Sequence, residues 1–472
     1  MFLYQSYDFN YMPDGFFLHM KGLSVLDLSF TAIVKLPESV SDLMSLTALF
    51  LRKCFSLRYV PSLAKLKKLR KLDFYHSGIK FIPEGLDMLV NLRYLNFDRC
   101  ALFIMPRRVL CKLTNLQFLA LPRSHQGPKV KAEDLELLTK LETFEGVLYD
   151  VNSFNAYARS IDQEKRLTRY MLHLGFSNSY VNYASDQDDN KIVYLTGNLW
   201  GSSSTTTTTT AREFLLLLPQ DVDVLVLHHC HGNIRSLCDL TSTSDACKLR
   251  LCHVQDCGGI EHLFSYSAEN EFPLLPNLEI LNLDGVIDLS GLIKTERGFP
   301  LPSGSFSCLK ELSICNCNNV KTLFAFEVSL LPNLEQFTLS NCVKLEAIMS
   351  TNQANNVIIV PKLSRLILSK LPKLNNVSMI ANSLQEIHID ECPELRKINP
   401  LLDGEQCPAS LMHVYIDRDT WSMLEWDSNN AKDFILSLMN LTNDSGNFYI
   451  LYYIHHVKKS YSNYVPTVKK IF

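Results

Sequence analysis

The stretches LRKLDFYHS at residues 69–77 and LRYLNFDRC at residues 92–100 share one pattern and lie about 23 residues apart. Each contains L-x-x-L-x-F, a variant of the pattern L-x-x-L-x-L, and has a serine or cysteine as its ninth residue. Further copies begin at positions 23, 46 and 116, so five copies follow one another at nearly equal steps. A repeat of this period must be one structural unit used many times.

The leucine pattern and the period of about 20–29 residues indicate leucine-rich repeats. Alternating apolar positions predict a short strand in each repeat, and that strand pairs with its counterpart in the next repeat. We therefore expect an α/β leucine-rich-repeat solenoid. It would have a curved parallel β-sheet on the concave face, and loops, 3-10 turns and short helices on the convex face.

The pattern continues at wider and less regular steps. These later copies begin at positions 222, 249, 278, 309, 334, 363, 384 and 411. Weaker copies begin at positions 141 and 167, and SDQDDN and GSSSTTTTTT are loop-like insertions between the two blocks. The expected organisation has five parts, namely a lead-in or partial repeat at 1–22, regular repeats at 23–140, irregular repeats with the Ser/Thr-rich insertion at 141–221, irregular C-terminal repeats at 222–427 and a non-repeat tail at 428–472.

The composition describes a soluble folded chain. It has 47% hydrophobic and 20% charged residues and a net charge of -3, which gives no general attraction to nucleic acid. No apolar run approaches the roughly 18 residues of a membrane span, and the N-terminus does not resemble a signal peptide. We expect a cytoplasmic protein whose fourteen cysteines stay reduced.

The sequence CLKELSICNC at 308–317 raises the question of a metal site. When the repeats are placed in register, the ninth position holds a cysteine in seven of them: Cys54, Cys100, Cys230, Cys257, Cys317, Cys342 and Cys392. This position takes a small side chain that packs inward, so Cys317 is predicted to be structural, with Cys315 on the opposite, outward side. The second cluster, at 228–231, contains three histidines and Cys230, but alternation along a strand should separate their ligand atoms. We predict no metal site.

No enzyme motif is present. The sequence lacks a P-loop, a dinucleotide-binding glycine pattern, a zinc-protease helix motif and a hydrolase nucleophile elbow. We therefore expect no catalytic residues and no cofactor.

A charge asymmetry distinguishes residues 46–112. They contain fourteen lysines and arginines against four acids, a net charge of +10, whereas the rest of the chain carries -13. A solvated face is one interpretation, and a docking surface for an acidic protein is the other. Nucleic acid is less favoured, because aromatic residues do not alternate regularly with the bases. The candidate partner-binding bases are Arg52, Lys53, Lys65, Lys67, Lys68, Arg70 and Lys71.

Several segments resemble the leucine-rich-repeat region of plant intracellular immune receptors of the coiled-coil, nucleotide-binding class. The resemblance rests on EDLELLTKLETFEGVLYDVNSFNAYARS at 133–160, CGGIEHLFS at 257–265, LPNLEILNL at 275–283, FSCLKELSICNCNNVKTLF at 306–324, CVKLEAIM at 342–349 and LEWD at 424–427. It covers roughly residues 17–427, and the run at 306–349 is its most specific part.

The resemblance implies a recognition role in defence. In such receptors the repeats sense a pathogen effector or a guarded host protein and restrain a nucleotide-binding switch domain. This sequence contains neither the P-loop of that domain nor a coiled coil, so the switch domain is expected to be supplied by another chain or to be missing altogether. A scaffold or adaptor for a separate switch or enzyme-complex subunit is the alternative. The concave-face candidates are Asp73, Tyr75, His76, Arg93, Tyr94, Gln385, Glu386, His388 and Asp390.

Overall fold

The computed structural model describes twelve segments of the chain. They are residues 8–124, 126–175, 190–197, 216–231, 235–239, 248–266, 273–295, 302–324, 331–349, 358–399, 410–426 and 429–438. The described residues fall into two compact units, the first reaching from the N-terminus to Cys230 and the second beginning at His231. The Ser/Thr-rich insertion and the tail beyond residue 438 lie outside the described residues.

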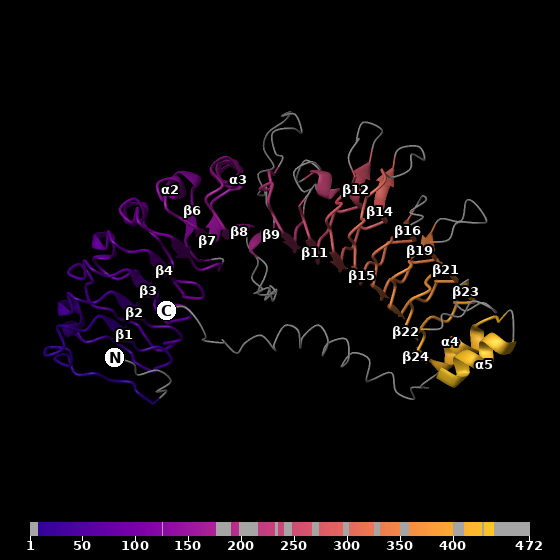
Figure 1. The fold of residues 1–472 in the computed structure, drawn as a ribbon, viewed down its shortest axis with the longest axis horizontal. Coiled ribbons are helices and arrows are strands. Elements are labelled where there is room, and N and C mark those ends of the chain that lie inside the picture. The colour runs from indigo at the N-terminus through magenta and orange to yellow at the C-terminus, as the bar shows by residue number, and fades with distance from the viewer. Residues whose placement is uncertain are drawn as a thin grey trace. The chain divides into compact units, whose positions relative to one another are not determined.

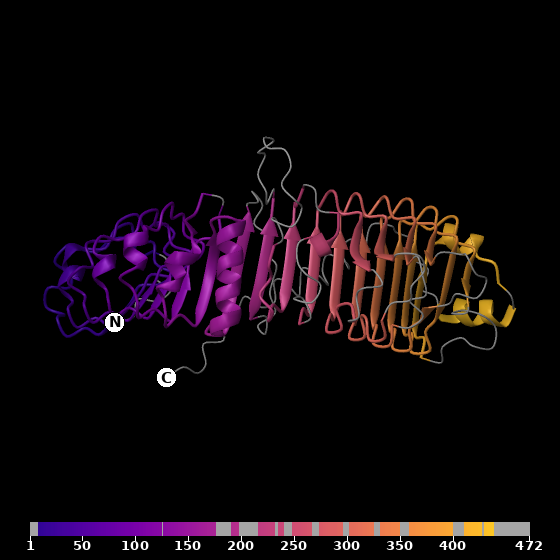
Figure 2. The ribbon, with the colours of Figure 1, turned by 90° about the horizontal axis from the view of Figure 1, so that it is seen from above.

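The first unit is built on a parallel sheet in which each strand pairs with the strand of the next repeat (Figures 1 and 2). The strands are β1 (Val25–Asp27), β2 (Ala48–Phe50), β3 (Lys71–Asp73), β4 (Tyr94–Asn96), β5 (Phe118–Ala120), β7 (Thr143–Leu148), β8 (Arg169–Gly175), β9 (Lys191–Thr196) and β10 (Val224–His228), with β6 (Lys129–Val130) beside β7. The register confirms the predicted period, because Leu26 pairs with Leu49, Leu49 with Leu72, and Leu72 with Leu95.

Short helices lie on the other side of this sheet. They are η1 (Glu38–Asp42), η2 (Leu86–Met88), α1 (Arg107–Leu110), α2 (Ala132–Glu136) and the longer α3 (Val151–Glu164). The Asp150 side chain caps α3 by accepting a hydrogen bond from the Ser153 amide. Phe154, Tyr157 and Ile161 are buried on the inner face of α3, where the Tyr157 ring meets Phe144 of β7 edge-on. No helix among the described residues is both long and apolar enough to cross a lipid bilayer.

The second unit has a first parallel sheet and, besides it, a two-stranded and a five-stranded parallel sheet, which together we call the second sheet (Figure 1). The strands of its first sheet are β11 (Leu251–Gln255), β13 (Ile280–Asp284), β15 (Glu311–Cys315), β17 (Gln336–Ser340), β20 (Arg365–Ser369), β22 (Glu386–Asp390) and β24 (His413–Ile416). They pair in this order with no register slip, although the sequence steps between repeats vary.

Short strands replace the turns and helices expected on the convex side of the second unit. They are β12 (His262–Tyr266), β14 (Gly291–Thr295), β16 (Thr322–Phe324), β18 (Ala347–Met349), β19 (Ile358–Ile359), β21 (Asn376–Ile380) and β23 (Lys397–Asn399), and one short 3-10 turn, η4 (Leu237–Asp239), precedes them. These segments are extended because apolar and polar side chains alternate in them. In β16, for example, Leu323 points into the core while Thr322 is half-exposed.

The core of each repeat depends on its neighbours. Leu72 is fully buried between Leu49 and Leu95, its counterparts on the adjacent strands. Full burial of a leucine contributes about 1.5–3 kcal/mol, and this burial requires a repeat on both sides.

Many of the strands end in a turn with one left-handed residue. Lys53, His76 and Arg99 occupy this position in successive repeats with φ of 54°, 55° and 58°. The Lys53 amide donates to the Tyr75 carbonyl and the His76 amide to the Asp98 carbonyl, so the hydrogen bonds between repeats continue through the turn. The same conformation recurs in the second unit at Asn316 and Asn341.

The cysteine column follows this turn and points inward, as predicted. All seven cysteines of the column are buried. Several of their Sγ atoms donate to the carbonyl of the last inward residue of the preceding strand, such as Cys54 to Leu28 at 3.1 Å and Cys100 to Phe74 at 2.9 Å. The twelve cysteines within the described residues are free thiols. A thiol at this position therefore fills a small space and satisfies a backbone acceptor.

Two helices close the end of the second unit next to β24. Helix α4 (Arg418–Met423) is capped by Asp417, whose Oδ1 accepts from the amides of Asp419 and Thr420. Helix α5 (Asn429–Leu438) packs beside β24. The residue Ile435 of α5 is completely buried, so the first part of the tail shields the last repeat.

We predict that Ile435→Asp destabilises the second unit, because it places a carboxylate against the apolar end of the repeats. The midpoint of chemical unfolding should fall by the equivalent of about 3 kcal/mol. Leu436→Asp is the matched control, since Leu436 is 49% exposed, and it should change stability by no more than about 0.5 kcal/mol. Equal effects of the two substitutions would show that α5 does not protect the core.

A second prediction concerns Cys317. Cys317→Ser should cost about 1 kcal/mol, because a hydroxyl can keep the hydrogen bond that Sγ donates to the Cys315 carbonyl at 3.2 Å. Cys317→Asp should cost about 3 kcal/mol or more, because it buries an unpaired charge. Thermal unfolding of the two variants measures the difference, and similar melting temperatures would contradict burial of this position.

Candidate protein-binding surfaces

The side chains between the buried leucines form the open face of each sheet. In the first unit the residue Asp73 of β3 lies on this face, but its side chain is completely buried. The Arg52 Nε atom donates to Asp73 Oδ2 at 2.5 Å. Burial raises the pKa of Asp73 even though Arg52 opposes the change. Asp73 was predicted to contact a ligand, but its charge is satisfied within the sheet.

Two further ion pairs lie on the open face, further along the same sheet. Arg123 makes two hydrogen bonds of 3.1 Å to Asp98, and Arg169 lies 3.8 Å from Glu145. Burial raises the pKa of Glu145, and this effect exceeds the lowering of the pKa by Arg123 and Arg169. These charges neutralise one another across neighbouring strands, so they offer little net charge to a partner.

The aromatic candidates also pack within the sheet. Tyr94 stacks on Phe118 of the next strand with ring centroids 4.3 Å apart, and burial raises the pKa of Tyr94 to about 12. His76 meets Phe55 edge-on at 4.9 Å and lies 6.0 Å from the Tyr75 ring. Burial lowers the pKa of His76, and the nearby charges of Arg99 and Lys53 lower it further.

The seven predicted bases divide into engaged and unengaged groups. Arg52 pairs with Asp73, and Lys65 lies 2.8 Å from Asp42. Lys67 donates to the Met88 carbonyl at 3.2 Å, and Lys53 lies over the Phe30 ring. The remaining three, together with Arg93, are exposed, and no carboxylate among the described residues lies within ion-pair distance of them. We call this group the basic edge: Lys68, Arg70, Lys71 and Arg93.

The backbone places the basic edge at the start of β3 and β4. The Arg93 amide donates to the Arg70 carbonyl at 2.8 Å, so the two arginines hold the same position in adjacent repeats. Lys71 pairs in register with Tyr94. Four positive side chains therefore come together at one end of two neighbouring strands, a grouping that the sequence count alone did not separate from the engaged bases.

In the second unit two of the predicted residues, Glu386 and His388, form one hydrogen-bonded group with Arg365, which was not predicted. His388 Nε2 lies 2.6 Å from Glu386 Oε1, and Arg365 Nε donates to Glu386 Oε2 at 2.6 Å. The His388 ring also stacks on Tyr415 with centroids 4.3 Å apart. The hydrogen bond with His388, together with Arg365, outweighs burial and lowers the pKa of Glu386 to about 2.

The other two candidates on β22 and beside it remain more accessible. Gln385 is exposed and Asp390 is half-buried. Burial raises the pKa of Asp390, and the carboxylates of Glu391 and Asp417 raise it further. This end of the open face is therefore acidic, in contrast to the basic edge of the first unit.

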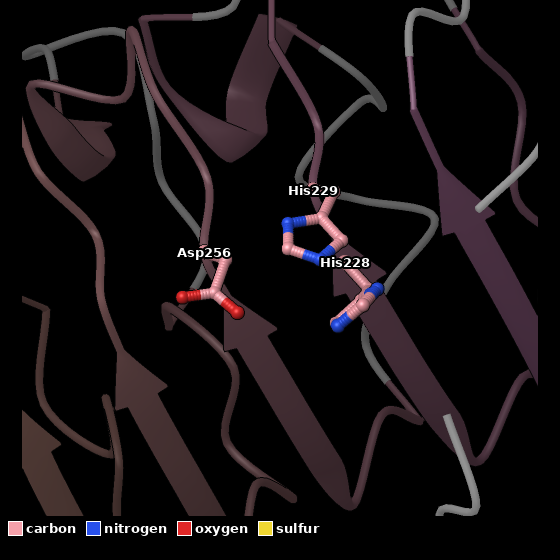
Figure 3. A group of neighbouring side chains, drawn as sticks. All are labelled: His228, His229 and Asp256. Atoms are coloured by element: carbon pink, nitrogen blue, oxygen red, sulfur yellow. The ribbon is translucent and has the colours of Figure 1, made fainter. Parts of the chain in front are cut away.

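The histidine cluster differs in one respect from the prediction. His228 ends β10, and His229 follows with a φ of 51°, which breaks the alternation of the strand. The two imidazole rings consequently lie together, with centroids 4.0 Å apart (Figure 3). Cys230 is separated from them, because its Sγ donates to the Leu195 carbonyl inside the unit at 3.3 Å. Asp256, also labelled in Figure 3, follows β11 of the second unit.

The cysteine pair in the motif at 308–317 is divided as expected, although both members are buried. Cys317 points into the core, while Cys315 Sγ lies 3.6 Å from the Ser313 hydroxyl on the open face. Cys315 lies on the opposite side from Cys317, as predicted, and it is nevertheless buried between Asp284 and Ser340, its counterparts on the adjacent strands. Burial raises the pKa of Cys317 well above its ordinary value.

Ionisation of Glu386 and of Glu145, the two glutamates on the open faces, should change the stability of the fold in opposite directions as the pH rises. The pKa of Glu386 falls from its ordinary 4.5 to about 2, so its carboxylate stabilises the fold above pH 4.5, and this stabilisation is lost as the pH falls towards 2. Glu386→Gln should therefore cost about 1–2 kcal/mol near pH 7 and progressively less in acid.

Glu145→Gln is the matched comparison. The raised pKa of Glu145 means that its charged form weakens the fold as the pH rises above 4.5, so the amide should cost nothing near pH 7 or should stabilise. Chemical unfolding between pH 3 and 7 measures both variants. Equal losses at neutral pH would contradict the difference in their surroundings.

Comparison with known proteins agrees with the repeat pattern. A family model for the leucine-rich repeats of plant disease resistance protein RPS2-like sequences matches residues 291–402. A disease resistance protein of Arabidopsis thaliana is 27% identical over 458 residues, which cover 91% of this chain and 44% of the relative. A second Arabidopsis disease resistance protein is 28% identical over 417 residues, covering 83% of this chain and 43% of the relative.

Solved structures give more distant likenesses. A leucine-rich-repeat protein of Leptospira interrogans has 17% identity and a TM-score of 0.44, with 91% of this chain and all of that chain covered. The functional domain of InlJ from Listeria monocytogenes has 14% identity and a TM-score of 0.40, with 88% and 73% covered.

The chain spans less than half the length of each of these two Arabidopsis relatives. What it shares with them is the repeat pattern, and the family match falls on the strands from β14 to β23. This chain is therefore similar to the leucine-rich-repeat regions of plant disease resistance proteins.

Proposed function

We propose that the chain is a non-catalytic recognition module of the plant intracellular immune receptor type, working in the cytoplasm. In this role it senses a pathogen effector or a guarded host protein, or restrains a nucleotide-binding switch domain, in the defence response. The repeat fold and the similarity to disease resistance proteins support the assignment.

The basic edge is the observation that carries this proposal. Lys68, Arg70, Lys71 and Arg93 are exposed and unpaired within the described residues, whereas the charges on the open face beside them are paired. Four cations held on two adjacent strands create a local positive field that internal acids do not cancel. Such a field speeds the association of a protein with an acidic surface and orients it.

The partner expected at the basic edge is the acidic surface of a switch domain. The basic edge belongs to a segment with a net charge of +10, which attracts acidic surfaces. At physiological salt this attraction extends over a Debye length of roughly 8 Å. Because exposed bases contribute little to folding, their grouping is explained better by binding than by stability.

The second candidate is a scaffold or adaptor that holds a separate switch protein or a subunit of an enzyme complex. The acidic end of the open face in the second unit favours a further contact with a different, basic partner. Affinity purification from plant tissue separates the two roles. An effector or host target as the main partner favours the recognition module, and a subunit of an enzyme complex favours the scaffold.

We predict that replacing all four residues of the basic edge with glutamate abolishes binding to the switch domain without unfolding the chain. The switch domain of a coiled-coil nucleotide-binding receptor can be supplied as a separate chain, and calorimetry in low and high salt measures the affinity. The wild-type complex should weaken steeply as salt rises, while stability of the variant should change by no more than about 1 kcal/mol.

The matched control replaces four exposed lysines of the second unit with glutamate: Lys344, Lys362, Lys373 and Lys432. It makes the same change in total charge, so a specific basic edge requires that this control still binds. Binding of both variants with wild-type affinity at low salt would show that the basic edge is only a solvated face.

A further inference from the structure

Two arginines of the basic edge lie side by side on adjacent strands. Arg70 directly precedes β3 and Arg93 directly precedes β4, so both hold the same position in their repeats. The Arg93 amide donates to the Arg70 carbonyl at 2.8 Å. Lys71, the first residue of β3, follows Arg70, and all three side chains are exposed. Because neighbouring strands lie about 4.8 Å apart, the three cationic side chains begin close together.

The second unit fills the same position with alternating charges. The residues that directly precede β11, β13, β15 and β17 are Arg250, Glu279, Lys310 and Glu335. Their backbones are joined in this order by hydrogen bonds, and Lys310 Nζ lies 3.1 Å from Glu279 Oε2. Alternation avoids the repulsion of like charges on neighbouring strands. The repeat fold therefore does not require two arginines side by side at this position.

The acid that follows in the row of the two arginines is engaged elsewhere. From Arg93 the row continues to Gln117 and then to Glu142, which stands two strands beyond Arg93. Glu142 Oε1 accepts a hydrogen bond from Gln117 Nε2 at 3.1 Å. This carboxylate therefore pairs with the amide between it and the arginines.

The acid nearest to Lys71 along β3 is also engaged. Asp73 is completely buried and forms its ion pair with Arg52. Within the described parts of the chain, no carboxylate lies within ion-pair distance of Arg70, Arg93 or Lys71. The repulsion between the like charges is thus retained in the chain on its own, as expected where a bound anion supplies the neutralising charge.

A phosphate monoester matches this arrangement better than a carboxylate does. A carboxylate has two oxygens, and the fork of one arginine occupies both of them. A phosphate monoester has three terminal oxygens and a charge of about −1.5 to −2 at pH 7. It can therefore accept hydrogen bonds from two guanidinium groups and one ammonium group together, and Arg70, Arg93 and Lys71 supply these donors.

The surface beside the cations favours a phosphate carried by a protein chain. Lys71 pairs in register with Tyr94, whose ring stacks on Phe118 with centroids 4.3 Å apart. Both aromatic side chains are partly exposed, so apolar surface borders the cations. The residues on either side of a phosphorylated side chain can pack on these rings, whereas a free phosphate or an inositol phosphate offers little apolar surface to them.

We propose that Arg70, Arg93 and Lys71 bind a phosphorylated serine or threonine of the partner protein. This proposal rests on the recognition role proposed above for the basic edge, and it adds the chemistry of the group that is bound. The phosphorylation state of the partner then controls docking, because the phosphoryl group supplies the negative charge that this part of the sheet lacks.

The test compares three libraries of short fluorescent peptides that have randomised flanks and a fixed central serine, phosphoserine or glutamate. Fluorescence anisotropy with the full chain measures the average affinity of each library. The phosphoserine library should bind at least about tenfold more tightly than the serine library. It should also bind at least about fivefold more tightly than the glutamate library, because a carboxylate engages only one arginine fully.

The double variant Arg70→Lys, Arg93→Lys separates hydrogen-bond geometry from charge. It keeps both positive charges but removes the planar forks. Affinity for the phosphoserine library should fall at least about tenfold, while affinity for the glutamate library should stay within about threefold of wild type. The matched control, Arg108→Lys with Arg418→Lys, makes the same change at two exposed arginines outside the basic edge and should leave both affinities unchanged. Thermal unfolding should find both double variants folded.

Three outcomes would overturn the phosphate assignment. The first is equal affinity of the wild-type chain for the phosphoserine and glutamate libraries. The second is unchanged affinity of the Arg70→Lys, Arg93→Lys variant for the phosphoserine library. The third is tighter binding of inositol hexakisphosphate or of a random single-stranded RNA than of the phosphoserine library, since the ligand would then not be a protein.

Each of these outcomes leaves docking of an acidic switch domain to the basic edge intact. The proposed function fails on a different measurement, namely wild-type affinity of the switch domain for the glutamate variant of the basic edge at low salt. The two failures are therefore distinguishable.

Discussion

Parallel pairing of each strand with its counterpart in the next repeat is the constraint on which the rest of this structure depends. Leu49, Leu72 and Leu95 are buried only because they stand side by side in register. The same register brings every other repeat position into a row, including the left-handed turn residue and the inward cysteine. The outward-facing positions follow the same order, so side chains at one repeat position lie in a row along the surface.

The rows differ in whether their charges are satisfied internally. Arg52 with Asp73 and Arg123 with Asp98 join adjacent strands across the open face, where water is partly excluded and an unpaired charge would be costly. Residues at the start of the strands face no such restriction. This is why Asp73, a predicted contact residue, forms an ion pair with Arg52, whereas Arg70 and Lys71 are exposed and have no carboxylate partner among the described residues.

The sequence predicted what depends on periodicity and missed what depends on tertiary surroundings. The strands, their register and the inward cysteines follow from spacing alone. Helix α3 breaks the leucine pattern, and the second sheet arises from alternation in segments such as β16 that are too short to distinguish from turns. The burial of Cys315 and the contact of His228 with His229 depend on neighbouring strands and on one φ angle, neither of which a pattern of residue types reveals.

The strands of the second unit keep their register although its repeats are unevenly spaced along the sequence. The extra residues of the longer repeats are therefore absorbed between the second sheet and the next strand of the first sheet, without a shift in the hydrogen-bonded core. Loop closure becomes only slightly more costly with length, about 0.6 kcal/mol for each doubling. A change in the length of one repeat therefore leaves the register of its neighbours intact, so repeats of different length can be combined in one sheet.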